Sequence, residues 1–143
     1  MTSIFLSIYP PSDFGGVRLA PYHFPMTGHR SAQLLPRMRV VQGSTILLGP
    51  GKADLLEAIE EHGTIRDAAT ALGMSYMRAW KLVRVMNAGF REPLVVVHRG
   101  GAERGSSELT AAGGRVLRLY RKIEADAIRA AKRNWEELQT LLR

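Results

Sequence analysis

The sequence has no cysteine, which excludes disulfide bridges, cysteine nucleophiles, thiolate metal sites and iron–sulfur clusters. It also lacks any apolar run near the ~18 residues that a membrane-spanning helix requires. The four histidines are scattered along the chain, so no metal site is expected. Phosphate-binding glycine loops, nucleophile elbows and paired catalytic carboxylates are missing as well. We therefore expect neither an enzyme, nor a bound cofactor, nor an integral membrane protein.

Acidic residues are missing from one segment in particular. The 143-residue chain holds 20 Lys+Arg against 13 Asp+Glu, a net charge of +7. Residues 75–91 contain four bases and no acid, directly after a segment, 51–74, in which acids outnumber bases. A basic excess favours a polyanionic partner, with nucleic acid first and an anionic membrane surface second. The uneven placement predicts one face that is reserved for an anion.

Composition divides the chain into three parts. Residues 1–36 hold five of the seven prolines, and neither a helical nor a strand period survives that density. They are predicted as an irregular N-terminal extension. Two interpretations of it stay open: an unstructured tail or over-extended start, and an arm that packs on a partner subunit. Residues 37–109 are predicted as a compact domain, and residues 110–143 as a long C-terminal helix.

Apolar spacing and turn residues predict the elements of residues 37–143. The expected order is a β-hairpin, three helices, two strands around a polar loop, and a final helix. The predicted bounds are Arg37–Gln42 and Thr45–Leu48 for the hairpin, about Lys52–His62, Thr64–Gly73 and Tyr76–Phe90 for the three helices, Leu94–His98 and Glu108–Leu109 for the strands, Arg99–Ser107 for the loop, and Thr110 to the C-terminus for the last helix. The fold class is mainly α with a small β component.

The second and third helices carry the spacing of a helix-turn-helix. Ala69 is small enough to let the two helices approach, and Gly73 can take the positive φ of a tight turn. Trp80 is expected in the core. The predicted inner face of the third helix consists of Ala79, Leu82, Met86 and Phe90. Followed by a strand, a basic loop and another strand, the pattern predicts that residues 37–109 form a winged helix-turn-helix DNA-binding domain.

The outer face of the third helix is the predicted DNA-reading surface, because its first residues can reach base edges in a major groove. Arg78 is expected to contact a base, and Lys81 and Arg84 are expected to contact phosphates. For Ser75 and Tyr76, contact with DNA stays open beside a role in capping and packing. The candidate DNA-binding residues are Ser75, Tyr76, Met77, Arg78, Lys81 and Arg84 and, from the wing, Arg99 and Arg104.

One cluster in the third helix is specific, the pattern S-Y-x-x-A-W formed by Ser75, Tyr76, Ala79 and Trp80. It lies within residues 49–87, GPGKADLLEAIEEHGTIRDAATALGMSYMRAWKLVRVMN, and Met86–Asn87, Pro93–Leu94–Val95 and Leu109–Thr110–x–x–Gly113 follow it. Over roughly residues 37–130 the chain resembles the N-terminal DNA-binding domain of bacterial ModE-type, molybdate-responsive transcription regulators. It is similar, more loosely, to the DNA-binding domain of LysR-type regulators. The resemblance implies a winged helix-turn-helix, dimerisation through the last helix, and a palindromic operator linked to molybdate transport or molybdenum enzymes.

Two departures from the family pattern bear on regulation and on the wing. ModE-type regulators usually continue into molybdate-binding domains, and this chain has no room for one after its last helix. Constitutive binding, another effector and a separate molybdate-binding protein therefore stay open. The wing loop RGGAERGSS is poorer in glycine than the family's wing. A contact of Arg99 or Arg104 with DNA stays open beside a solvated loop.

The last helix carries an apolar stripe that is too long for one small core to cover. An exposed stripe of that length favours association, so a homodimer through this helix is predicted, with a helix folded back on its own domain as the alternative. The stripe consists of Val116, Leu119, Tyr120, Ile123, Ala127, Ala130, Ala131, Trp135, Leu138 and Leu142.

The leading prediction is a cytoplasmic, dimeric, sequence-specific regulator that binds double-stranded DNA. Two alternatives stay open. One is a winged-helix module that binds another protein, for which an apolar outer face on the third helix would be expected. The other is non-specific binding of nucleic acid, which predicts equal affinity for any duplex and a purely salt-governed response.

Overall fold

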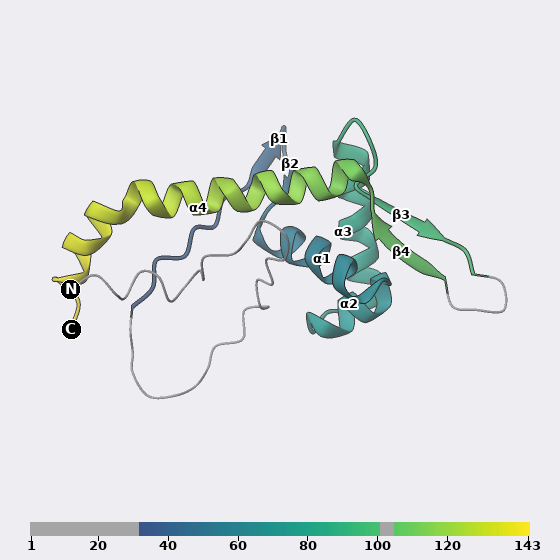
Figure 1. Ribbon diagram of the computed structural model, residues 1–143, viewed down its shortest axis with the longest axis horizontal. Helices are drawn as coiled ribbons and strands as arrows, with labels where there is room; N and C mark the ends of the chain where they lie inside the picture. The colour runs from purple at the N-terminus through teal and green to yellow at the C-terminus, as the bar shows by residue number, and fades with distance from the viewer. Residues whose placement is uncertain (1–31, 101–104) are drawn as a thin grey trace.

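The computed structural model describes residues 32–100 and 105–143. A three-helix body carries a β-ribbon on one side, and a long helix runs across the body and beyond it (Figure 1). The prediction for residues 1–31 and the prediction for Arg104 both lie outside the described residues. The elements are β1 Val40–Gln42, β2 Thr45–Leu48, α1 Pro50–His62, α2 Ile65–Ala71, α3 Tyr76–Gly89, β3 Val95–His98, β4 Ser106–Leu109 and α4 Ala111–Gln139.

The predicted first hairpin is confirmed. Its two strands pair antiparallel around a turn in which Gly43 has a φ of 58°. The first strand begins at Val40, three residues later than predicted. Leu47 and Leu48 are buried, so the hairpin packs its second strand against the body.

Capping residues fix the ends of α1 and α2. Helix α1 begins at Pro50 rather than Lys52, because a proline in the first turn loses no hydrogen bond. It ends at Gly63, which has the left-handed φ of 71°. The side chain of Thr64 then accepts a hydrogen bond from the backbone N–H of Asp67 at 3.0 Å and starts α2. Gly63 as the end of α1 and Thr64 as the N-cap of α2 both match the sequence prediction.

The turn between α2 and α3 has the geometry of a helix-turn-helix. Gly73 takes a φ of 64°, and Met74 donates its backbone N–H to the Ala69 carbonyl at 2.9 Å. On α3 the buried residues are Ala79, Val83 and Met86. The prediction that Leu82 faces inward is wrong in part, because Val83 is buried and Leu82 is only half-buried at the edge of the core.

Two further predicted core residues lie at the rim. Trp80 and Phe90 pack against the core cluster and stay half-buried, and α3 itself ends at Gly89. The cluster joins all four helices to the second hairpin. Its large members with less than 2% exposure are Leu55, Leu56, Ile59, Met86 and Leu94.

The wing is the ribbon of β3 and β4, paired antiparallel from Val95↔Leu109 to His98↔Ser106. Its second strand begins at Ser106, two residues before the predicted start at Glu108. The Asn87 side chain fixes the ribbon to α3: its amide donates to the Val95 carbonyl at 2.8 Å and accepts from Leu94 N–H at 2.9 Å. The fold is therefore the predicted winged helix-turn-helix.

Helix α4 starts at the cap Thr110 and continues for 29 residues, about 43 Å. Its first turn lies against the wing at Gly113, where a Cβ would clash with the Leu94 carbonyl. Farther along, Tyr120 is buried and donates its hydroxyl to the Met38 carbonyl at 2.8 Å. Leu119, Ile123 and Leu138 of the predicted apolar stripe are about half exposed.

Candidate nucleic-acid interface

The outer side of α3 carries exposed basic side chains. Arg78, Lys81 and Arg84 lie on this side, and Met77 beside them is 59% exposed. None of the three bases forms an ion pair with an acid of residues 32–100 or 105–143. Solvent-facing cations without protein anions are available to a polyanion, because no intramolecular pair has to be broken.

The first turn of α3 is held by a cap and a ring stack. The Ser75 hydroxyl accepts the backbone N–H of Arg78 at 3.2 Å, so the capping role left open for Ser75 is present. The Tyr76 ring stacks on Trp80 with centroids 6.4 Å apart and stays 42% exposed. The cap and the ring stack hold the first turn of α3, and the other side chains of the outer face follow on the same helix.

Of the two wing arginines that are predicted to contact DNA, Arg99 lies within the residues that the structure describes. Arg99 follows β3 directly and is exposed. Across the ribbon, His98 Nε2 lies 2.9 Å from Glu108 Oε1. This pair joins the outer end of β3 to Glu108 of β4, two residues farther along than Ser106, which is opposite His98.

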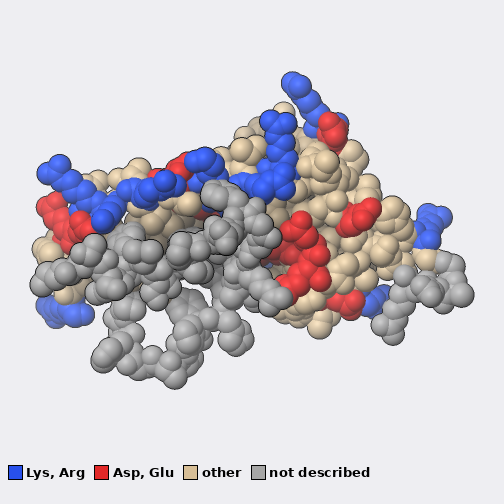
Figure 2. Space-filling view, viewed as in Figure 1, with Lys and Arg blue, Asp and Glu red and all other residues tan. Residues whose placement is uncertain are grey.

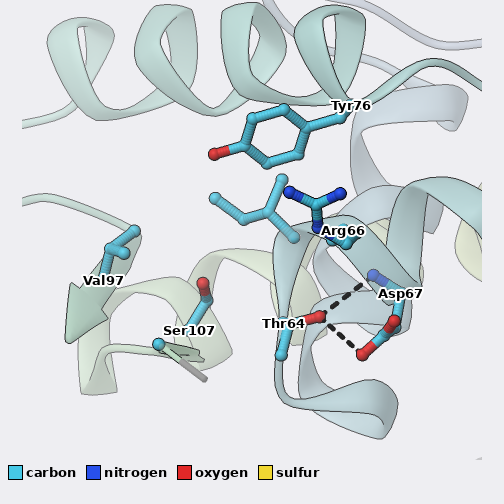
Figure 3. Close-up of a pocket in the computed structure, with 8 residues that line it drawn as sticks. Thr64, Arg66, Asp67, Tyr76, Val97 and Ser107 are labelled. Atoms are coloured by element: carbon cyan, nitrogen blue, oxygen red, sulfur yellow. Dashed lines mark hydrogen bonds between the residues drawn. The ribbon is translucent and has the colours of Figure 1, made fainter. Parts of the chain in front are cut away.

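A hollow of about 560 Å³ lies between the start of α2, the start of α3 and the wing. Arg66 stands beneath the Tyr76 ring, with its guanidinium carbon 5.3 Å from the ring centroid, and Val97 and Ser107 face it from the wing (Figure 3). Sequence reasoning missed Arg66 and Ser107. Arg66 lies outside the acid-free run, and Ser107 is brought there by the bond from its N–H to the Gly63 carbonyl at 2.7 Å.

A second group of charges has a structural role. The Arg121 guanidinium of α4 lies 2.6 Å from Asp54 and 2.9 Å from Glu57, both on α1, and 2.8 Å from Glu124. Burial lowers the pKa of Arg121, but hydrogen bonds to Glu57, Asp54 and Glu124 outweigh it, so the pKa is raised overall. Figure 2 shows acidic side chains gathered where Figure 1 draws α1, with bases following α4 above them.

Glu124 is the buried member of this group. It is 4% exposed, and its Oε1 has no hydrogen-bond partner among the described residues. Its neighbour Tyr120 has a raised pKa, because burial and then the charge of Glu124 disfavour the phenolate. The acids therefore neutralise an α4 cation and fix α4 on α1.

The described part of the chain offers no cluster of three or more His, Cys, Asp or Glu side chains suited to a metal ion. Within the same residues, no helix combines the length and the apolar character of a membrane span.

Comparison with known proteins finds sequence relatives, although no family model matches the chain. The "Molybdenum transport protein ModE" of Azotobacter vinelandii is 36% identical over 108 residues, which cover 76% of this chain and 40% of that protein. The "Molybdenum-pterin-binding protein MopA" of Rhodobacter capsulatus is 37% identical over 83 residues, 58% of this chain and 31% of that protein. A "Transcriptional regulator ModE" of Haemophilus influenzae is 30% identical over 95 residues, 66% of this chain and 36% of that protein.

Among solved structures, the chain is similar to the "Crystal structure of CbnR_DBD-DNA complex". It has a TM-score of 0.48 and 25% identity, and the match covers 62% of this chain and 95% of that one. The chain spans 31–40% of the length of the three curated relatives above. Over the greater part of its own length, the chain is thus similar to the ModE and MopA proteins, which confirms the resemblance to ModE-type regulators predicted from Ser75, Tyr76, Ala79 and Trp80.

Proposed function

We propose that the chain is a transcription regulator that binds double-stranded DNA sequence-specifically, as a homodimer on a palindromic operator. The observation that carries the proposal is the outer face of α3, where Arg78, Lys81 and Arg84 are exposed and unpaired with any described acid. A protein-binding winged helix is less consistent with this face, because burying three unpaired cations against a protein costs desolvation. Relatives named as transcriptional regulators support the same function, and support a cytoplasmic protein without catalytic activity.

The roles of the individual residues follow from their positions on the helix. Arg78 in the first turn is assigned to a base edge, where a bidentate contact with guanine discriminates against other bases. Lys81 and Arg84, farther along, are assigned to phosphates, which position the protein. Tyr76 and Met77 stand exposed beside them. Ser75 caps the helix and presents its hydroxyl at the same end, and Arg99 is assigned to the backbone or minor groove from the wing.

Dimerisation is assigned to residues 110–143, and DNA binding to residues 37–109. Leu119 and Ile123 lie one turn apart on α4, and Leu138 lies farther along the same helix; each is about half exposed. Burying such a stripe against a second copy removes apolar surface from water. Two-fold symmetry then places two α3 helices about 34 Å apart, or a multiple of that distance, on the operator.

The regulated genes are assigned to molybdate transport or molybdenum enzymes. Two of the similar proteins carry molybdenum in their names, one as a transport protein and one as a molybdenum-pterin-binding protein. A separate molybdate-binding protein is one source of the regulatory signal, beside constitutive binding and another effector.

The DNA-binding assignment is tested by reversing charges on α3. The double variant Arg78→Glu/Lys81→Glu is expected to abolish binding of a labelled duplex while its circular dichroism and melting temperature stay those of the wild type. The matched control is Arg39→Glu/Arg91→Glu, at two exposed bases outside α3 and α4, which changes the net charge equally. Unchanged affinity in the α3 variant, or equal loss in both variants, would refute a specific role of α3.

The dimer is tested by light scattering at micromolar concentration. The wild type is expected to have twice the mass of the chain, and Ile123→Asp is expected to have the mass of a monomer, because a carboxylate in an apolar interface is not solvated. A monomeric wild type would contradict the dimer.

A further inference from the structure

Ser107, at the wing side of the hollow between α2, α3 and the wing, is a polar residue with a hydroxyl that is open to the hollow. Ser107 is 5% exposed, and its side chain makes no hydrogen bond to any residue of 32–100 or 105–143. Because the hydroxyl oxygen is not sealed off by the protein, it is available to donate a hydrogen bond to a ligand in the hollow. Figure 3 shows the Ser107 and Tyr76 hydroxyls turned toward the same space, with the Arg66 guanidinium at its edge.

The charges around the hollow favour an acceptor ligand. Among the described residues that line it, Arg66 is the one base and Asp67 the one acid. The carboxylate of Asp67 accepts the Thr64 hydroxyl at 2.8 Å and is turned away from Tyr76 (Figure 3). The side chains that remain for a ligand are the Arg66 guanidinium, which only donates and is charged, and the Tyr76 and Ser107 hydroxyls, which can donate.

Apolar side chains line the same hollow beside these donors. Ile65 and Val97 lie among the lining residues, and Val97 is 45% exposed. A nucleic-acid backbone combines acceptor oxygens with an apolar sugar face, whereas a free oxyanion has only acceptors. Contacts to phosphates from Arg and Ser side chains are common in DNA complexes and set the register of the protein.

We propose that this hollow is a subsite for one phosphodiester of the DNA backbone, with Arg66 and Ser107 donating to the phosphate oxygens. Tyr76 is the positioning residue: its ring holds the Arg66 guanidinium by a cation–π contact. The inference rests on the proposed DNA-binding function and adds a residue of α2 and a residue of the wing to it. One strand of the DNA then passes between the wing and the first turn of α3.

The test is the salt dependence of duplex binding, measured by fluorescence anisotropy over a series of KCl concentrations. Losing one phosphate contact lowers the slope of log K against log salt by about 0.9. Arg66→Gln is expected to show this loss with about tenfold weaker binding near physiological salt. Ser107→Ala is expected to weaken binding and keep the slope, because its hydroxyl is neutral. Arg91→Gln, at an exposed base beyond the end of α3 with no assigned contact, is the control and is expected to change neither.

The positioning role is tested by a conservative pair. Tyr76→Phe keeps the ring and is expected to keep the wild-type slope, whereas Tyr76→Leu is expected to lose slope as Arg66→Gln does. Equal behaviour of the two Tyr76 variants would overturn this role. Melting temperatures of the Arg66→Gln and Tyr76→Phe variants are expected to match the wild type, because Arg66 and Tyr76 are exposed.

Each outcome separates this subsite from the proposed function. If the wild type binds duplex DNA and Arg66→Gln keeps both affinity and slope, the subsite is refuted and the DNA-binding function stands. If the wild type binds no duplex, the function falls and the subsite with it. If inorganic phosphate shifts the amide resonances of Arg66 and Ser107 at submillimolar concentration while Arg66→Gln leaves duplex binding unchanged, the hollow takes a free oxyanion, which contradicts a backbone site.

Discussion

Two groups of basic side chains, on α3 and on α4, share their chemistry and differ in their surroundings. Arg78, Lys81 and Arg84 on α3 stand in solvent without a described anion. Arg121 on α4 has a side chain that is 16% exposed and lies within 3 Å of Asp54, Glu57 and Glu124. The bases of α3 are available to bind a ligand, whereas Arg121 is engaged in ion pairs that hold α4 on α1.

This difference shows that the net charge of a sequence segment does not distinguish ligand-binding bases from bases that stabilise the fold. Both segments are basic in sequence, and α4 contributes to the net charge of +7 as α3 does. Two of the acids that neutralise Arg121 come from α1, more than 60 residues earlier. A basic residue is available to a ligand where the fold leaves it without an ion pair to an acid.

The largest expected effect is on the α4 side of the comparison. Arg121→Met removes the cation and leaves three carboxylates together, two of them about one-fifth exposed and Glu124 almost fully buried. We expect the free energy of unfolding to fall by about 3 kcal/mol, measured by urea denaturation. Arg129→Met, on the exposed part of the same helix, is the control and should change little. Equal small losses in both would mean that the buried group does not hold α4.

The second effect is on the α3 side and concerns recognition rather than folding. Arg78→Gln is expected to lose about 1–3 kcal/mol of discrimination at one operator position, because a bidentate guanine contact is removed. Its unfolding free energy should stay within about 0.5 kcal/mol of the wild type, as for an exposed substitution. Competition binding with operator variants measures the first quantity. Loss of stability together with retained discrimination would reverse the roles assigned to the two groups.

A third effect distinguishes the stability of α3 from the charge of its outer face. Ser75→Ala removes the hydroxyl that caps α3, and a lost N-cap costs about 1 kcal/mol. Thermal unfolding should show this loss. Ser75→Asp, which restores an acceptor at the cap, should recover stability and yet weaken binding, because it places an anion beside Arg78. Recovery of both properties would remove Ser75 from the interface.

The smallest effect distinguishes a residue of α3 that contacts phosphates from one that contacts a base. Lys81→Gln should weaken binding to every duplex about equally and lower the slope of log K against log salt by about 0.9. Titrations against operator and random duplexes at several salt concentrations measure it. A loss confined to the operator would show that Lys81 reads a base.

Local signals in the sequence predict the helices and turns of this fold well. Thr64, Ser75 and Thr110 cap the helices as expected, and Gly63 and Gly73 take the positive φ values that end α1 and turn α2 into α3. These features depend on residues close in sequence. The burial of Val83 instead of Leu82 depends on how α3 crosses the body, which helical spacing leaves undetermined within one residue.

The candidate site divides in the same way. The exposed bases of α3 follow from periodicity and from a run without acids, so they are predictable from the sequence. Arg66 and Ser107 share the hollow only because β4 bonds to the Gly63 carbonyl, a contact between residues 44 positions apart. The Arg121 group likewise joins α1 to α4. Tertiary contacts of this kind carry no local sequence signal.

Selection of binding sites from a randomised duplex pool tests the central claim most directly. The wild type and Arg78→Gln are selected in parallel at near-physiological salt, and the wild-type selection is repeated with molybdate. The account predicts an inverted repeat for the wild type, and the same repeat with one position relaxed in each half-site for Arg78→Gln. Absence of enrichment by the wild type in both conditions, or identical sites for both proteins, would contradict the claim that the exposed basic face of α3 reads DNA.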